Sequence, residues 1–353
     1  VGSVATLTGD VILKGHLIGT SGTLDIKSFF FNRDNTGGSA IIQDNGTLII
    51  AADNAPNKFS SYVLGPASTV IFNGTGAQHL LLPGIVYGNI RFRNSGTKTL
   101  YTPISVNGDL TIESGATFNG GSNTITLNGN WTNDGTYVPA TSTVFCAGNL
   151  KNISGNNTFH RLTVSGSYTM LNNNTINELL RITSTGNING GANIVTTMNG
   201  DLINNGILYT LGTTTFTGNI LQTLSLINAV QTVAITVNFN GSVSPVLNST
   251  SAPQYGFLNI NNTAGVNASV GYSILYGLSV GAGASFNAGA STHNLYGYLN
   301  NNGTITSSGT FNILPATATN INLGNNFTST GRVVFGGAGA ITMTGSPLSF
   351  KNI

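Results

Sequence analysis

The stretch Gly115–Gly135, which reads GATFNGGSNTITLNGNWTNDG, decides the fold because the chain contains it more than once. Residues 283–303 read GASFNAGASTHNLYGYLNNNG and align with it without a gap, at an offset of 168 residues. Weaker copies end at Gly206 and at Gly331. Apolar residues recur at fixed places in these copies, with Asn, Gly, Thr and Ser between them, and this pattern indicates an internal repeat.

Two apolar positions are kept in all four copies when the copies are aligned on their last glycine. One lies four residues before that glycine, and the other lies eight residues before it. Apolar and polar residues alternate around them, as in Thr124–Leu127, which is typical of a strand with one buried face. We therefore predict that these positions form the structural core ladder: Leu127, Trp131, Met198, Leu202, Leu295, Leu299, Leu323 and Phe327.

A second recurring element sets the length of the repeat. It begins as STVIFNG at Ser68 and returns at Ser142, Gly212 and Gly331, so the starts lie 74, 70 and 119 residues apart. The long unit contains insertions of 24 and 21 residues relative to the others. Insertions of nearly constant length indicate a stacked coil of about 21–24 residues.

The same spacing predicts how the chain is organised along its length. We expect degenerate coils first, then three repeat units, the third with two extra coils, and then the start of a further unit. The predicted ranges are 1–67 for the degenerate coils, 68–141, 142–211 and 212–330 for the repeat units, and 331–353 for the start of the next.

These features predict an all-β fold, a parallel β-helix or β-solenoid of roughly 15 coils. Glycine and asparagine recur too densely for helices of ordinary length, and no stretch carries a sustained 3.6-residue apolar stripe. Asn and Gly tolerate left-handed backbone at corners, and stacked Asn amides can bond to one another. The alternative fold is a tandem array of β-sandwich repeats, in which each domain needs about 100 residues.

Composition limits the classes of function. Only 6% of the residues are charged, whereas 40% are hydrophobic, so there is ample material for a core. No Lys/Arg-rich run is present, which argues against nucleic acid as a partner. No apolar run is long enough to cross a bilayer, so we predict a chain that does not span a membrane. The sequence begins at Val1 without an initiator Met or a signal peptide, and we expect the natural protein to continue into further repeats.

Few residues are candidates for chemistry. The four histidines, His16, His79, His160 and His293, share no ligand spacing, and the acidic residues are scattered singly. Asp109 and Glu113 would lie about 13 Å apart on one face of a strand. That distance exceeds the separation of about 5–9.5 Å between glycosidase carboxylates. We therefore interpret both as solvated surface charges, and we predict no catalytic residue, no metal site and no cofactor.

Two residues are weak candidates for contact with a glycan. Arg91 and Arg93 alternate onto one face beside Phe92, where they could hold an acidic sugar. A solvated strand edge is the simpler interpretation of the same pair. The one cysteine, Cys146, aligns with Phe72 of a neighbouring copy, and we interpret it as a small buried hydrophobe rather than a reactive thiol.

The block Leu110–Gly148, LTIESGATFNGGSNTITLNGNWTNDGTYVPATSTVFCAG, resembles the repetitive segments of large surface proteins that Bacteroidota export by the type IX system. These proteins include the giant gliding-motility adhesins. The resemblance covers roughly residues 68–353 and rests on GNWTNDGT followed by the STV-F-G element. It carries over no catalytic residue, because the pattern has none.

The resemblance implies a secreted, extracellular segment of a long cell-surface filament or adhesin that is structural and adhesive rather than enzymatic. Its expected partners are surface glycans or other cell-surface and secretion proteins. The alternative from a different class is a carbohydrate-binding or polysaccharide-cleaving β-helix protein. A groove with clustered Asp, Arg and exposed aromatic side chains would favour the alternative, and an even Asn/Thr surface would favour the adhesin.

Overall fold

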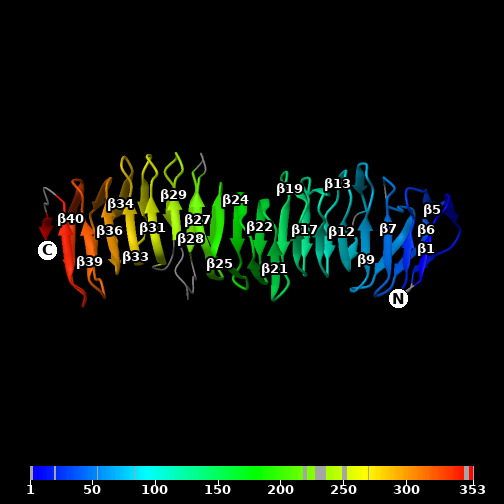
Figure 1. Ribbon diagram of the computed structural model, residues 1–353, viewed down its shortest axis with the longest axis horizontal. Helices are drawn as coiled ribbons and strands as arrows, with labels where there is room; N and C mark the ends of the chain where they lie inside the picture. Colours follow the sequence, from blue (N-terminus) through cyan, green and yellow to red (C-terminus); the bar gives the residue numbers. More distant parts are fainter. Residues whose placement is uncertain are drawn as a thin grey trace. The chain divides into compact units, whose positions relative to one another are not determined.

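The computed structural model describes residues 3–19, 21–53, 55–82, 84–217, 221–226, 236–248, 253–268, 270–345 and 350–352. These residues form 42 strands and no helix (Figure 1). The strands stack in parallel as a β-solenoid of about 16 turns. The predicted fold class is therefore confirmed. The chain divides into two compact units, Val1–Asn172 (unit 1) and Asn173–Ile353 (unit 2).

The strands of unit 1 are β1 (Val4–Thr6), β2 (Val11–Leu13), β3 (Leu17–Gly19), β4 (Thr23–Asp25), β5 (Phe31–Arg33), β6 (Gly37–Ile42), β7 (Thr47–Ile50), β8 (Phe59–Leu64), β9 (Thr69–Phe72), β10 (Gln78–Leu80), β11 (Val86–Tyr87), β12 (Asn89–Phe92), β13 (Thr97–Leu100), β14 (Ile104–Val106), β15 (Leu110–Ile112), β16 (Thr117–Asn119), β17 (Thr124–Leu127), β18 (Trp131–Asn133), β19 (Thr136–Val138), β20 (Thr143–Cys146), β21 (Lys151–Ser154), β22 (Asn157–Val164) and β23 (Ser167–Met170).

The strands of unit 2 are β24 (Asn174–Ile182), β25 (Asn187–Met198), β26 (Asp201–Asn204), β27 (Ile207–Phe216), β28 (Thr223–Leu226), β29 (Thr236–Phe239), β30 (Val246–Asn248), β31 (Gln254–Ile260), β32 (Val266–Ala268), β33 (Ser273–Val280), β34 (Ser285–Gly289), β35 (Thr292–Leu295), β36 (Tyr298–Asn301), β37 (Thr304–Ser307), β38 (Thr310–Ile313), β39 (Thr319–Asn322), β40 (Phe327–Phe335), β41 (Ile341–Thr344) and β42 (Phe350–Asn352).

Each strand pairs in parallel with the strand one turn away, and the register gives the length of each turn. The steps between paired residues run from 17, between Lys151 and Tyr168, to 24, between Thr23 and Thr47. The predicted coil of 21–24 residues is thus correct at its upper end, and some turns are shorter because their corners are tighter. Parallel pairing also overturns the β-sandwich alternative, since sandwich sheets are antiparallel.

The core of each unit consists of apolar side chains that recur rung over rung, because alternate residues of a strand point to the same side. In unit 1 one such column runs through successive turns. Its members are Leu24, Leu48, Val70, Ile90, Leu110, Trp131, Ile153 and Met170. In unit 2 a comparable column contains Val237, Leu258, Leu278, Leu299 and Ile321.

The outer faces carry ladders of asparagine. The Nδ2 atom of Asn128 donates to the Oδ1 atom of Asn107 at 3.2 Å, and Asn199 donates to Asn177 at 3.1 Å. The expectation that stacked amides satisfy one another is therefore confirmed. Glycines occupy corners where turns approach closely: a Cβ atom on Gly129 would overlap the carbonyl group of Gly108.

The compact units and the predicted repeat units are different partitions of the chain. The division at Asn172/Asn173 falls within the repeat unit predicted for residues 142–211. Residues 346–349 and 353, which belong to the predicted range 331–353, lie outside the described residues, as do 218–220, 227–235, 249–252 and 269 of the range 212–330. Among the described residues, no helix has the length and apolar character that crossing a membrane requires.

Candidate functional site

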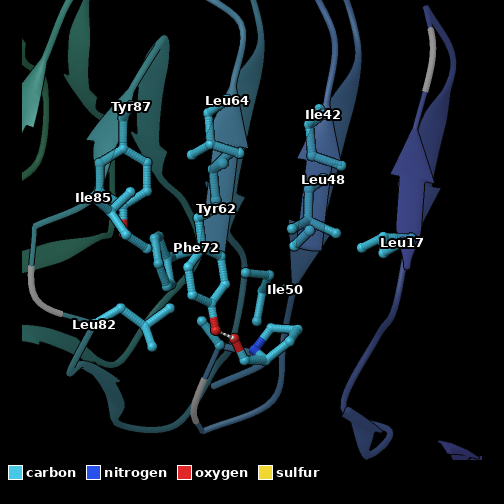
Figure 2. A pocket seen from close by; sticks show the side chains of 14 residues that line it. Leu17, Ile42, Leu48, Ile50, Tyr62, Leu64, Phe72, Leu82, Ile85 and Tyr87 are labelled. Carbon is cyan, nitrogen blue, oxygen red and sulfur yellow. Dashed lines mark hydrogen bonds between the residues drawn. The ribbon is translucent and has the colours of Figure 1, made fainter. Parts of the chain in front are cut away.

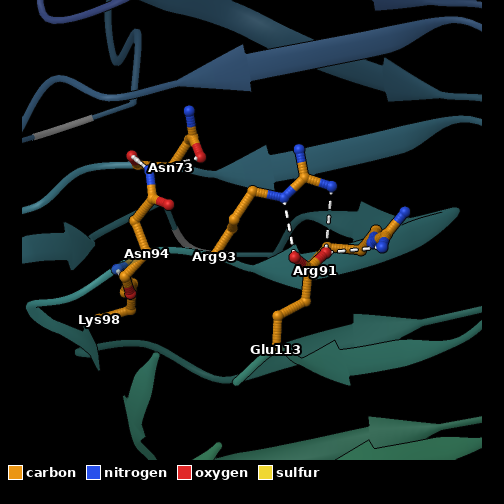
Figure 3. Close-up of polar contacts among 6 residues, drawn as sticks. All are labelled: Asn73, Arg91, Arg93, Asn94, Lys98 and Glu113. Carbon is orange, nitrogen blue, oxygen red and sulfur yellow. Dashed lines mark hydrogen bonds and ion pairs between the residues drawn. The ribbon is translucent and has the colours of Figure 1, made fainter. Parts of the chain in front are cut away.

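Arg91 and Arg93 converge on a single carboxylate (Figure 3). Both arginines belong to one turn, at the end of β12, and Glu113 follows β15 one turn later. The Nε and Nη2 atoms of Arg93 donate to the two carboxylate oxygens of Glu113 at 2.9 and 3.1 Å. The Nη2 atom of Arg91 lies 2.6 Å from Oε1 of the same residue. The predicted placement of the two arginines on one face is confirmed.

The pairing consumes much of the positive charge of the cluster. The hydrogen bond from Arg93, assisted by the charge of Arg91, lowers the pKa of Glu113, so this carboxylate is ionised at neutral pH. The three side chains remain 42%, 34% and 25% exposed in the order Arg91, Arg93 and Glu113. The cluster of two arginines and one glutamate therefore carries a net charge of +1. An acidic sugar would compete with Glu113 for the hydrogen-bond donors of Arg91 and Arg93.

Lys98 of β13 lies next to Asn94 (Figure 3) and is fully buried. Its Nζ atom donates to the carbonyl oxygens of Gly74, Asn94, Ser95 and Gly96 at 2.9, 3.1, 2.9 and 3.2 Å. Burial lowers its pKa from 10.5 to about 8, while the carbonyl cage favours the charged form. The ammonium is thus protonated at pH 7 and holds one corner of the coil together.

The acidic residues serve separate structural contacts. The Oδ1 atom of Asp109 accepts from the backbone N and the Nδ2 of Asn130 at 2.8 and 2.9 Å. Asp109 and Glu113 are therefore not the free solvated charges that the sequence indicated, because each bonds to a neighbouring turn. Asp201 accepts from the backbone N of Thr223 at 2.8 Å. Within the described ranges, no three His, Cys, Asp or Glu side chains come close enough to hold a metal ion.

The histidines occupy unrelated environments. The Nδ1 atom of His79 lies 2.6 Å from Asp53, and Nδ1 of His16 accepts from the backbone N of Ser39 at 3.0 Å. His293 is buried, and its Nε2 lies 2.6 Å from the carbonyl oxygen of Ala288, so this nitrogen carries the proton. Burial lowers the pKa of His293, which keeps the ring neutral. His293 is therefore a hydrogen-bonded core residue.

An apolar cavity of about 30 Å³ lies among the first turns of unit 1 (Figure 2). Leu17, Ile42, Leu48 and Phe72 are among its lining residues, and the hydroxyl of Tyr62 at its edge donates to a carbonyl oxygen at 2.6 Å. Ligand pockets have volumes of about 300–1,000 Å³. This cavity is a packing gap of the core rather than a binding site.

All eight predicted ladder residues are buried. They do not stack on one another, however. Trp131 lies between Leu110 and Ile153 of the adjacent turns, and its Nε1 donates to Asn157 at 2.8 Å. Equivalent positions of the sequence copies lie 28 to 196 residues apart, which is more than one turn, so spatial neighbours come from different parts of the repeat. Cys146 is buried with a raised pKa, as predicted for a small core hydrophobe.

One surface feature is not among the residues predicted from the sequence, namely a cluster of three aromatic side chains in unit 2. Phe257, Tyr276 and Tyr298 lie together although 41 residues separate the first from the last. A signal was present, since no Asp, Glu, Lys or Arg occurs between Asp201 and Arg332 while Tyr and Phe recur at outward strand positions.

Comparisons with known proteins give no family. No protein-family model matches the chain, and no curated protein and no solved structure matches it.

Proposed function

We propose that the chain is a structural and adhesive segment of a long extracellular cell-surface protein and has no enzymatic activity. The observation that carries the proposal is the repeated rung: parallel turns of 17–24 residues joined by backbone bonds, apolar columns and amide ladders. Such a stack gains extent and surface with each turn, and its stability is approximately the sum of intrinsic turn and interface terms. A segment of this kind suits spanning distance and presenting a surface.

The engagement of the polar residues supports the same function. Lys98 is enclosed by carbonyl oxygens, Glu113 bridges two arginines, and Asp109 bonds the next turn. Each ionisable group in these contacts stabilises the stack. Export by the type IX system and an origin in Bacteroidota belong to the proposal through the sequence resemblance, as do surface glycans or other cell-surface proteins as partners.

The proposal is tested on intact cells that produce the protein. Antibodies raised against the segment should label unpermeabilised cells, and treatment of the cells with protease should release long fragments because the stacked turns resist cleavage. Deletion of the segment should reduce attachment of the cells to a surface. Labelling only after permeabilisation would contradict the proposed location, and release of new reducing ends from a polysaccharide by the purified segment would contradict the non-enzymatic role.

The second candidate, a carbohydrate-binding β-helix, is favoured by the aromatic cluster of unit 2. A cleaving enzyme would instead need acidic groups converging on one bond, with carboxylates about 5–9.5 Å apart for a glycosidase.

A further inference from the structure

Three aromatic rings gather on the outer surface of unit 2. The ring of Phe257 (β31) lies 5.3 Å from that of Tyr276 (β33) and 6.3 Å from that of Tyr298 (β36), centroid to centroid. They face outward, because Leu258 and Leu299, the residues that follow Phe257 and Tyr298, are buried in the core. Tyr276 remains 52% exposed, whereas Phe257 and Tyr298 are half-buried.

Gly277 explains why the rings of Phe257 and Tyr298 lie close together. Phe257, Gly277 and Tyr298 occupy the same position on three successive turns. Gly277 leaves a space on this face, and the ring of Tyr298 fills it so closely that a Cβ atom on Gly277 would overlap the ring. Cross-strand aromatic packing of this kind stabilises a sheet. Tyr276 lies outside this column of three, and half of its surface stays in water.

Amides and hydroxyls border the rings. Two residues further along the strands, an outward ladder contains Asn238, Asn259, Ser279, Asn300 and Asn322. Within it, Asn259 donates to Asn238 at 2.8 Å and Asn322 donates to Asn300 at 3.1 Å. An amide has two donor hydrogens and an acceptor oxygen with two lone pairs. One bond to a neighbouring amide leaves further hydrogen-bonding capacity at the surface.

This surface lies in a stretch without charge. Residues 202–331 contain no Asp, Glu, Lys or Arg, and the one histidine among them, His293, is buried. A ligand there is recognised by ring stacking and neutral hydrogen bonds rather than by ion pairs. A pyranose offers these chemistries together, because one face of the sugar carries C–H groups and its edge carries hydroxyls.

We infer that the surface formed by Phe257, Tyr276, Tyr298, Asn259 and Asn300 binds a neutral polysaccharide. A pyranose ring stacks on the exposed face of Tyr276, and its hydroxyls bond to the amides of Asn259 and Asn300. The inference deepens the adhesive part of the proposed function and rests on it. It moves glycan contact away from Arg91 and Arg93, which bind Glu113.

The test is affinity electrophoresis of the purified chain in gels that contain hydroxyethyl cellulose, mannan or dextran, with alginate as the acidic comparator. We expect at least one neutral polymer, and not alginate, to retard the wild-type chain. Tyr276→Ala should weaken that retardation, with an increase of about tenfold in the dissociation constant for the polymer. This factor corresponds to ~1.4 kcal/mol and lies within the range for aromatic contacts. Tyr276→Phe should retain it, because the ring face is unchanged.

Tyr101→Ala is the matched control, since Tyr101 is also 52% exposed but lies in unit 1. It should bind as the wild type does. The inference is overturned if none of the neutral polymers retards the chain, if Tyr276→Ala binds normally, or if Tyr101→Ala loses binding equally. A negative result that accompanies antibody labelling of intact cells removes the glycan surface and leaves the structural function standing, with a protein as the remaining partner class.

Discussion

The Nζ atom of Lys98 donates a hydrogen bond of 2.9 Å to the carbonyl oxygen of Gly74, which lies one turn earlier in the coil. The same ammonium binds three carbonyls of its own turn. A cation supplied by the chain thus holds a corner at which several carbonyl groups converge. Its removal would leave those oxygens without their donor.

We predict that Lys98→Met lowers the free energy of unfolding by about 2 kcal/mol, since buried acceptors without a partner cost roughly 1–3 kcal/mol. Chemical denaturation followed by circular dichroism measures the change. Lys14→Met is the control, because the side chain of Lys14 is 82% exposed and its ion pair lies at the surface. Equal stability of Lys98→Met and the wild type would show that the cage contributes nothing.

From the lowered pKa of Lys98 we also predict that the free energy of unfolding rises in mild alkali. Its pKa is 10.5 when unfolded and about 8 in the fold. Between these values the unfolded chain binds more protons, so the free energy of unfolding increases as the pH rises above 8. Above about pH 9 the trend reverses, because burial raises the pKa of Cys146 and of several tyrosines such as Tyr255.

The measurement is the denaturation midpoint at a series of pH values from 7 to 10. The difference between wild type and Lys98→Met isolates the contribution of this one group, since the other titrating groups are common to both chains. A difference that stays constant from pH 7 to 9 would contradict the lowered pKa.

From the lowered pKa of His293 we predict that the free energy of unfolding falls in acid. Burial lowers its pKa below the ordinary value of 6.5, so the unfolded chain takes up a proton first as the pH falls. The contribution is fully present above pH 6.5 and is lost below it. His293→Phe, which continues the ring column with Phe311 one turn later, should remove this part of the acid sensitivity. Parallel acid titrations of both chains, with His16→Phe as the exposed control, would reveal whether the slope changes.

Gly129→Ala should destabilise the chain by about 3 kcal/mol, because the new methyl group overlaps the backbone of Gly108 and the corner must open. Gly9→Ala is the matched control, as open space surrounds its Cβ position, and it should be neutral or slightly stabilising. Thermal unfolding of the two variants compares them directly. Indistinguishable melting would mean that the turns are not stacked in the described register.

Glu113→Gln should release Arg91 and Arg93 from their shared carboxylate. We expect a loss of stability of up to about 1 kcal/mol, as for a surface ion pair, and a gain of salt-sensitive retardation in alginate gels. Asp134→Asn changes the formal charge equally at an exposed position outside the cluster and should not gain binding. Identical retardation of the two variants would assign the effect to net charge alone.

Much of the fold follows from local pattern. The alternation of apolar and polar residues in Thr124–Leu127 predicted that Leu127 points inward. The position of Trp131 is apolar in every copy of the repeat, which predicted that Trp131 is buried. Both properties depend on which side of a strand a residue faces, and a period of two residues settles that. The polar contacts between turns could not be predicted in the same way. Lys98 sits at an inward position, where a charged residue contradicts the pattern and only the carbonyl cage explains it.

By itself the sequence determined that the chain is all-β, that it coils in short stacked turns, and that the apolar side chains at the recurring ladder positions are buried. Only the tertiary structure decided which residues of different turns meet: Glu113 with Arg91 and Arg93, and Phe257 with Tyr276 and Tyr298. The reason is the length of the corners. Turns vary from 17 to 24 residues. Each added or missing corner residue therefore changes which residues of neighbouring turns are paired.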